Sequence, residues 1–207
     1  MHTRLSINSN YNKDNNMKKL LLVITLSLLL LLAGCSQGDE EMTIFPAGFT
    51  AKERDLMWLL GKENDQHIFD FLPGKDVKTM DITVWKLNGK EWEELHKSSR
   101  QFVDERGRIA FEFDNIGEYI SIALQSETNS GRVTNTGKEV AMRVSATTSC
   151  LNKTEKIVYG KEIPLIVQVV TTKNMVTAHG VESFENPEVY LTDNYEYVYA
   201  VTVKFDK

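Results

Sequence analysis

Apolar residues at every second position are the feature that most restricts how this chain folds. Residues 80–85 and 109–113 alternate apolar side chains with others, and residues 195–205 place three tyrosines, two valines and a phenylalanine on one face. Successive side chains of a β-strand point to opposite faces, so a period of two predicts strands with one buried face. The sequence therefore predicts a domain built mainly from β-strands.

Turn residues between these runs predict hairpins. Asn88-Gly89 precedes residues 91–95 and has the composition of a type I′ turn, whose two central residues need positive φ angles. Residues 115–117, Asn-Ile-Gly, lie between the run at 109–113 and a further alternation at 120–124. Each turn predicts an antiparallel pair of neighbouring strands.

The second half of the chain predicts further strands. Residues 126–138 are rich in Ser, Thr, Asn and Gly and predict an exposed loop, after which residues 140–144 begin another strand. Residues 163–170 are almost continuously apolar, which predicts a strand buried on both faces. Residues 189–191 predict a short strand, with a turn at Asp193-Asn194 before the last strand.

One short helix is predicted before the strands. Thr50-Ala51-Lys52-Glu53 is a capping-box pattern, and leucines at helical spacing follow it as far as Gly61, which predicts a helix over 51–60. We expect its apolar face to pack on a sheet edge or to close one end of the core.

Together these elements predict one mainly β domain over residues 42–207. About ten strands and one short N-terminal helix favour an antiparallel β-sandwich, immunoglobulin-like in architecture only. The alternative is two small sandwiches divided near residues 126–138, each with a thin core and exposed edges.

The N-terminal segment has the composition of a secretory signal. Lys18 and Lys19 precede residues 20–34, a mostly apolar run that is short for a membrane-spanning helix. Met17 is a better start than Met1, because residues 1–16 are polar and resemble an upstream extension.

Leu32-Ala33-Gly34-Cys35, at the end of that run, resembles the lipobox of bacterial lipoproteins. The resemblance implies lipid, including palmitate, on the Cys35 thiol and cleavage just before it, so that residues 1–34 are removed. Residues 35–41 then form a lipidated tether. The implied location is the extracytoplasmic face of the cell membrane, with lipid on Cys35 as the membrane contact.

Charge restricts the partners of the mature segment. The chain has 24 basic and 29 acidic residues, but four of the basic and only one of the acidic residues precede Cys35, which leaves a net charge near −8 after cleavage. Nucleic-acid phosphates are repelled by such a surface, so no nucleic-acid partner is expected.

No motif for catalysis, cofactor binding or metal binding is found in the sequence. If Cys35 carries lipid, Cys150 has no second cysteine to pair with, and we interpret it as a small buried side chain at a strand end. The expected protein is therefore not an enzyme and holds no cofactor or metal.

Trp85 and Trp92 are the candidate partner-binding residues. They flank the Asn88-Gly89 turn, and exposed tryptophans can stack on sugars or anchor a protein partner. The competing interpretation is that both pack in the domain as a cross-strand pair. The sequence favours a non-enzymatic module that binds a protein, peptide or envelope glycan. Alternatives are a hydrolase acting on envelope polymers and a lipoprotein that shields or assembles an envelope complex.

Overall fold

The structure is a computed structural model that describes residues 41–207, apart from 60–65, 103 and 138–144. Residues Glu41–Lys207 form one compact unit. The predicted signal peptide, the lipobox-like segment and Cys35 lie outside the described residues.

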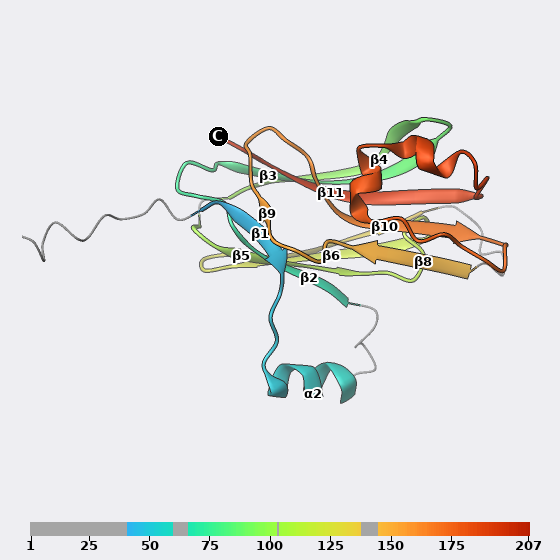
Figure 1. The fold of residues 1–207 in the computed structure, drawn as a ribbon. Helices are drawn as coiled ribbons and strands as arrows, with labels where there is room; N and C mark the ends of the chain where they lie inside the picture. The colour runs from blue at the N-terminus through green and yellow to red at the C-terminus, as the bar shows by residue number, and fades with distance from the viewer. Residues whose placement is uncertain (1–40, 60–65, 103, 138–144) are drawn as a thin grey trace, which may run out of the picture. The chain divides into compact units, whose positions relative to one another are not determined.

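Two antiparallel sheets make up most of the described chain, as the alternating pattern predicts (Figure 1). In order across the sheet, the six-stranded sheet contains β7 (Ser130–Thr136), β6 (Tyr119–Ser126), β5 (Gly107–Glu112), β2 (Gln66–Leu72), β1 (Thr43–Pro46) and β9 (Glu155–Lys156). The five-stranded sheet contains β4 (Glu91–Gln101), β3 (Thr79–Asn88), β11 (Tyr197–Asp206), β10 (Ile163–Thr171) and β8 (Ser145–Cys150).

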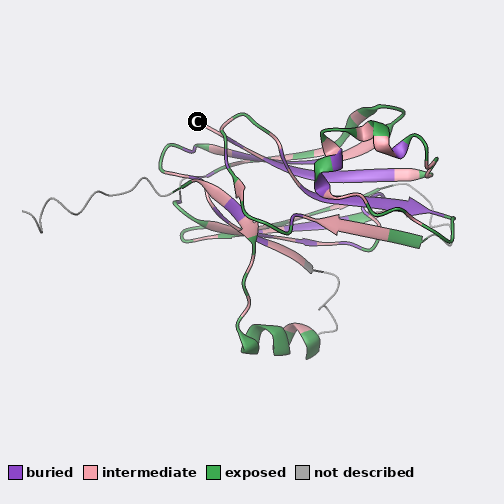
Figure 2. Cartoon of the chain, in the orientation of Figure 1, coloured by how far each residue is buried: buried purple, intermediate pink, exposed green. Residues whose placement is uncertain are grey.

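One hydrophobic core lies between the two sheets and gives the domain a sandwich-like architecture (Figure 2). Phe71 of β2 and Phe205 of β11 meet across it, with their ring centroids 5.3 Å apart. Ile109, Phe111 and Ile120, which the alternation places inward, are fully buried. The removal of these apolar side chains from water is the main force that holds the sheets together.

Both predicted hairpins are confirmed, and the first turn differs in detail. Asn88 pairs with Glu91, so the two central residues of the turn are Gly89 and Lys90. Among the described residues of this turn only Gly89 has a positive φ, at 63°. A positive φ at the first central residue is typical of a type II′ turn, so the predicted type I′ turn with Asn88 and Gly89 at its centre is wrong.

Strand β10 is buried on both faces, as its continuous apolar sequence predicts. Its second face is covered by the chain between β10 and β11, which contains the 3₁₀ helices η1 (Val181–Phe184) and η2 (Pro187–Tyr190). Val181 and Tyr190 are the buried side chains of this cover. The predicted strand at 189–191 is wrong, because Pro187 begins a 3₁₀ turn at this point.

The predicted loop at 126–138 is also corrected. Residues Ser130–Thr136 form β7, which pairs with β6 along its whole length at the edge of the six-stranded sheet. Polar residues suit an edge strand whose outer side faces water. Strand β11 pairs with β3 and β9 pairs with β1, so both sheets combine strands from either side of this segment. Residues 140–144, predicted to begin a strand, lie outside the described residues.

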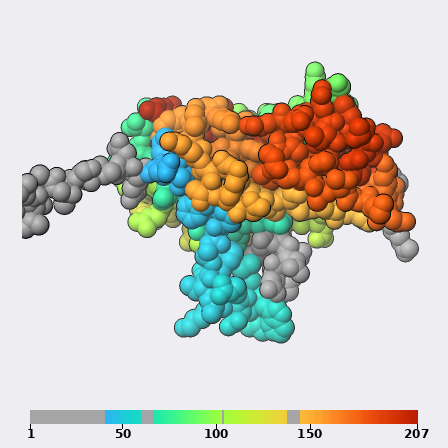
Figure 3. All heavy atoms as spheres, in the orientation of Figure 1, coloured from blue at the N-terminus to red at the C-terminus, as the bar shows by residue number. Residues whose placement is uncertain are grey.

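Helix α2 (Ala51–Leu59) begins with the predicted capping box. The backbone N–H of Thr50 donates to Glu53 at 2.7 Å, and the Glu53 N–H donates to the Thr50 hydroxyl at 3.3 Å. The expected packing of its apolar face is wrong, because Leu56, Trp58 and Leu59 are 58%, 67% and 72% exposed. Figure 3 shows α2 protruding from the two sheets. In the described chain, no helix has the length and apolarity needed to cross a membrane.

Candidate ligand-binding cleft

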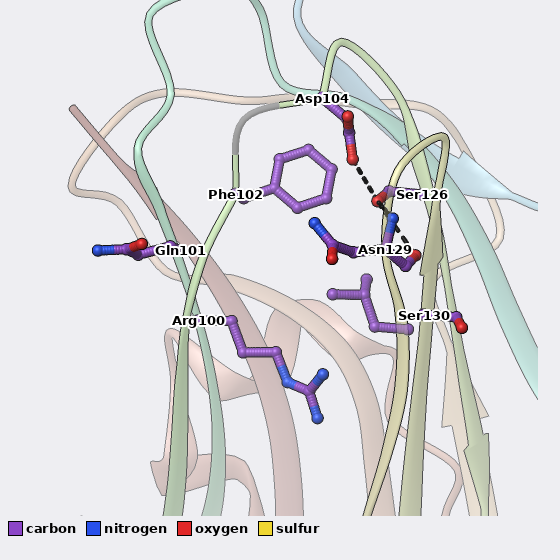
Figure 4. Close-up of a pocket in the computed structure, with 8 residues that line it drawn as sticks. Arg100, Gln101, Phe102, Asp104, Ser126, Asn129 and Ser130 are labelled. Atoms are coloured by element: carbon purple, nitrogen blue, oxygen red, sulfur yellow. Dashed lines mark hydrogen bonds between the residues drawn. The ribbon is translucent and has the colours of Figure 1, made fainter.

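A polar cleft of about 320 Å³ lies between the end of β4 and the turn that joins β6 to β7 (Figure 4). These elements come from different sheets, so the cleft opens along one side of the domain where two edge strands, β4 and β7, approach each other. Its lining consists of Arg100, Gln101, Phe102, Asp104, Leu124, Ser126, Asn129 and Ser130.

Arg100 carries the positive charge of this cleft. It pairs with Met80 in the β3–β4 ladder and extends its side chain from β4 toward β7. A Cβ atom on Gly131 of β7 would lie 2.4 Å from Arg100 Nη1, so the guanidinium lies directly against the Gly131 backbone. The absence of a side chain at residue 131 is what leaves room for the guanidinium.

The Arg100 guanidinium has no hydrogen bond or ion pair within the described chain, in contrast to the other arginines there. The partners of the others are Phe49 O for Arg54, Glu127 for Arg106, Asp70 for Arg108 and Glu112 for Arg132. Arg100 is half-buried as a residue, and its guanidinium lines the cleft without a described protein acceptor. Such a cation is suited to an anionic ligand.

Asp104 carries the negative charge at the other end of the cleft as seen in Figure 4. Its carboxylate accepts hydrogen bonds from the hydroxyls of Ser126 and Thr128, the latter at 2.9 Å. The bond from Ser126 is the main cause that lowers the pKa of Asp104 below its ordinary value, so the carboxylate is charged at neutral pH. These bonds tie Asp104 to the β6–β7 turn.

Phe102 and Leu124 supply the apolar part of the lining. Both are buried, and the Phe102 ring lies between Arg100 and Asp104 in Figure 4. The Phe102 N–H donates to Lys78 O at 2.8 Å, and its ring lies 5.2 Å from that of Phe71. The apolar lining is therefore fixed by the core.

A second cleft of about 470 Å³ near β2 and β5 also contains two arginines, but both are neutralised. Arg108 forms two hydrogen bonds with the carboxylate of Asp70, at 2.6 and 2.9 Å. Arg106 lies 2.7 Å from Glu127. Neither cation is left for a ligand, which distinguishes this cleft from that of Arg100.

Trp85 and Trp92 both lie against Phe184 of η1. The Phe184 ring is 6.0 Å from that of Trp85 and 5.1 Å from that of Trp92. Each indole N–H has a partner, Thr202 Oγ1 for Trp85 and Phe184 O for Trp92, both at 2.9 Å. Both rings are half-buried and pack against the core. Part of each ring remains open to solvent.

Cys150 and His67 lie together although 83 residues separate them. Cys150 Sγ is 3.1 Å from His67 Nδ1, and Phe113 stacks on the imidazole with centroids 5.0 Å apart. A nucleophile and base need such proximity. However, burial raises the pKa of the Cys150 thiol to about 12, whereas reactive cysteines have lowered values. The pair therefore has the proximity of a nucleophile and a base, whereas the raised pKa favours the protonated thiol over the thiolate.

Sequence patterns did not reveal the cleft. Asp104 and Glu105 are neighbouring acidic residues, which are usually exposed, yet Asp104 is only 8% exposed. Arg100 occupies a polar stretch of β4 that has no motif. The one residue of the sequence that points to the cleft is Gly131, which leaves room for Arg100. That role becomes apparent only when Arg100 of β4, in the other sheet, is known to lie against it. Within the described residues, no group of three or more His, Cys, Asp or Glu side chains could hold a metal ion.

Comparison with protein-family models, with curated proteins and with solved structures gave no match.

Proposed function

We propose that this chain is a lipoprotein anchored by lipid on Cys35 at the extracytoplasmic face of the cell membrane, and that its β domain is a non-enzymatic binding module. The Leu32–Cys35 lipobox supports the anchor. The unpaired, half-buried Arg100 in a polar cleft carries the binding assignment, because a cation without a protein partner in such a place is suited to a ligand.

Anchoring is tested by membrane fractionation and fatty-acid labelling of the full chain. Cys35→Ser should abolish labelling and leave the chain unprocessed or released from the membrane. Cys150→Ser is the matched control, since it changes the other cysteine and should leave labelling intact. A processed, membrane-bound Cys35→Ser variant would contradict the lipobox assignment.

The partner in this proposal is a protein, a peptide or an envelope glycan. The net charge near −8 after Cys35 disfavours nucleic acid. The solvent-facing parts of Trp85 and Trp92 are a second candidate contact surface, supported by their aromatic character and partial exposure. In architecture, we propose an immunoglobulin-like arrangement of the two sheets.

Binding is tested by capture of envelope components on the solubilised full chain. Arg100→Gln should weaken capture if the cleft is the site, and a Trp92→Phe variant should weaken it if the aromatic surface is. The alternative of a hydrolase would use Cys150 and His67. It predicts loss of activity on envelope polymers in Cys150→Ser with unchanged capture.

A further inference from the structure

We infer that the Arg100 cleft binds the terminal carboxylate of a short peptide. This inference rests on the proposed binding function and names the ligand class for it. A guanidinium presents paired N–H donors in a planar fork that matches the two oxygens of a carboxylate. Among the described residues no side chain or carbonyl accepts a hydrogen bond from Arg100, so these donors are available to a ligand.

The position of Arg100 holds its guanidinium in place at the cleft, unlike that of an arginine free on the surface. Its guanidinium lies against Gly131 of β7, where any side chain would displace it. Contact with the opposite edge strand limits the rotamers of the long side chain and lowers the entropy cost of binding.

Asp104 restricts which anions the cleft accepts. Its charged carboxylate repels ligands that carry several negative charges, such as phosphates, but it attracts N–H donors. Ser126 and Thr128 hold this carboxylate, and no ion pair joins it to Arg100. A peptide end offers both required features, because its carboxylate suits Arg100 and its amide or amino N–H groups suit Asp104.

The size and lining of the cleft favour a peptide end over an acidic sugar. About 320 Å³ is at the lower end of small-molecule sites and suits a chain end. Phe102 and Leu124 are buried and expose little apolar surface to the cleft, which suits a peptide end with a small side chain such as alanine. Sugar rings are bound by broad exposed aromatic faces, whereas Phe102 is only 3% exposed.

The test uses the detergent-solubilised full chain in calorimetric titrations with N-acetyl-alanyl-alanine, its C-terminal amide and glucuronate. The acid peptide should bind saturably. The amide should bind at least about 10-fold more weakly, because it lacks the carboxylate that pairs with the Arg100 guanidinium. Equal binding of acid and amide, or no binding of the acid, would overturn the inference. Binding of glucuronate without the peptide would also overturn it.

Substitutions locate the site. Arg100→Gln should weaken binding of the acid peptide about 10-fold or more, whereas Arg132→Gln, which removes an exposed cation of β7 that pairs with Glu112, should not. If Arg100→Gln fails to fold, Gly131→Ala replaces it, because the flexible end of Arg100 can move aside while the strand is retained. Unchanged binding in a folded variant would contradict the assignment.

The two proposals fail in different ways. Only the membrane fractionation of Cys35→Ser can contradict the proposed anchor. Failure of the acid peptide to bind, with continued capture of an envelope component, would reject the peptide-carboxylate inference and leave the binding function standing.

Discussion

The side-chain oxygen of Gln168 accepts a 2.8 Å hydrogen bond from the backbone N–H of Ile116, and this bond joins the two sheets. Gln168 belongs to β10, whereas Ile116 lies in the turn between β5 and β6. The Gln168 amide nitrogen also donates to Asp114 O at 2.8 Å. One buried side chain thus satisfies two backbone groups of the opposite sheet.

Gln168→Leu should lower the free energy of unfolding by about 1–3 kcal/mol, because the N–H of buried Ile116 loses its acceptor. Gln125→Leu, at an exposed position of β6, is the control and should change stability little. Urea unfolding followed by circular dichroism measures both. Equal stabilities for the two variants would show that the cross-sheet bond contributes nothing.

Trp92→Ala should destabilise the domain by about 2–3 kcal/mol, somewhat less than is usual for a fully buried tryptophan. The change removes stacking on Phe184 and the indole hydrogen bond to its carbonyl. Trp58→Ala on exposed α2 is the matched control and should cost under about 0.5 kcal/mol. If Trp58→Ala lowered the stability of the domain and Trp92→Ala did not, the assignment of Trp92 as packed and Trp58 as exposed would be wrong.

Cys150 should make the domain sensitive to alkaline pH. Its pKa rises from an ordinary 9 to about 12 on folding, so the unfolded chain loses this proton first. The associated stability is complete below pH 9 and is lost as the pH rises toward 12. Between about pH 8 and pH 10, the urea midpoint should therefore fall further for the native chain than for Cys150→Ala. Parallel profiles would refute a raised pKa.

Glu196 should contribute stability that disappears in acid. Hydrogen bonds from the hydroxyls of Thr171 and Thr172 lower the pKa of this carboxyl from 4.5 to about 2. Its stabilising effect is therefore present above pH 4.5 and is lost as the pH falls toward 2. Glu196→Ala should lower the melting temperature at pH 7, and the difference from the native chain should narrow by about pH 2. A difference that stays constant with pH would contradict this account.

Local patterns in the sequence predicted the parts of the fold that local physics determines. The period of two predicted the strands, and the turn residues between them predicted the hairpins. The apolar run at 163–170 predicted a doubly buried β10, and Thr50 and Glu53 predicted the start of α2. In each case the signal lies within a few residues of the structure that it specifies.

The remaining features depend on contacts between distant segments. Edge strand β7 has a loop-like composition, but it forms a strand because its backbone pairs with that of β6 in an antiparallel ladder. The 3₁₀ helices η1 and η2 pack over β10 because the strands leave an apolar face that would otherwise be exposed to water. Arg100 reaches Gly131 only after the two sheets stack. No window of neighbouring residues contains that information.

Strand β1 is the part of the domain on which tension from the preceding chain would first act, if the proposed anchor on Cys35 holds it. It begins at Thr43, next to the N-terminal segment, and pairs with β2 over four residues and with β9 over two. Tension on the preceding chain, as a membrane tether would exert, acts first on these few hydrogen bonds. Ile44, fully buried, is the one core side chain of β1 that resists extraction. Under load the domain would therefore lengthen by releasing one short strand before the central strands of either sheet are strained.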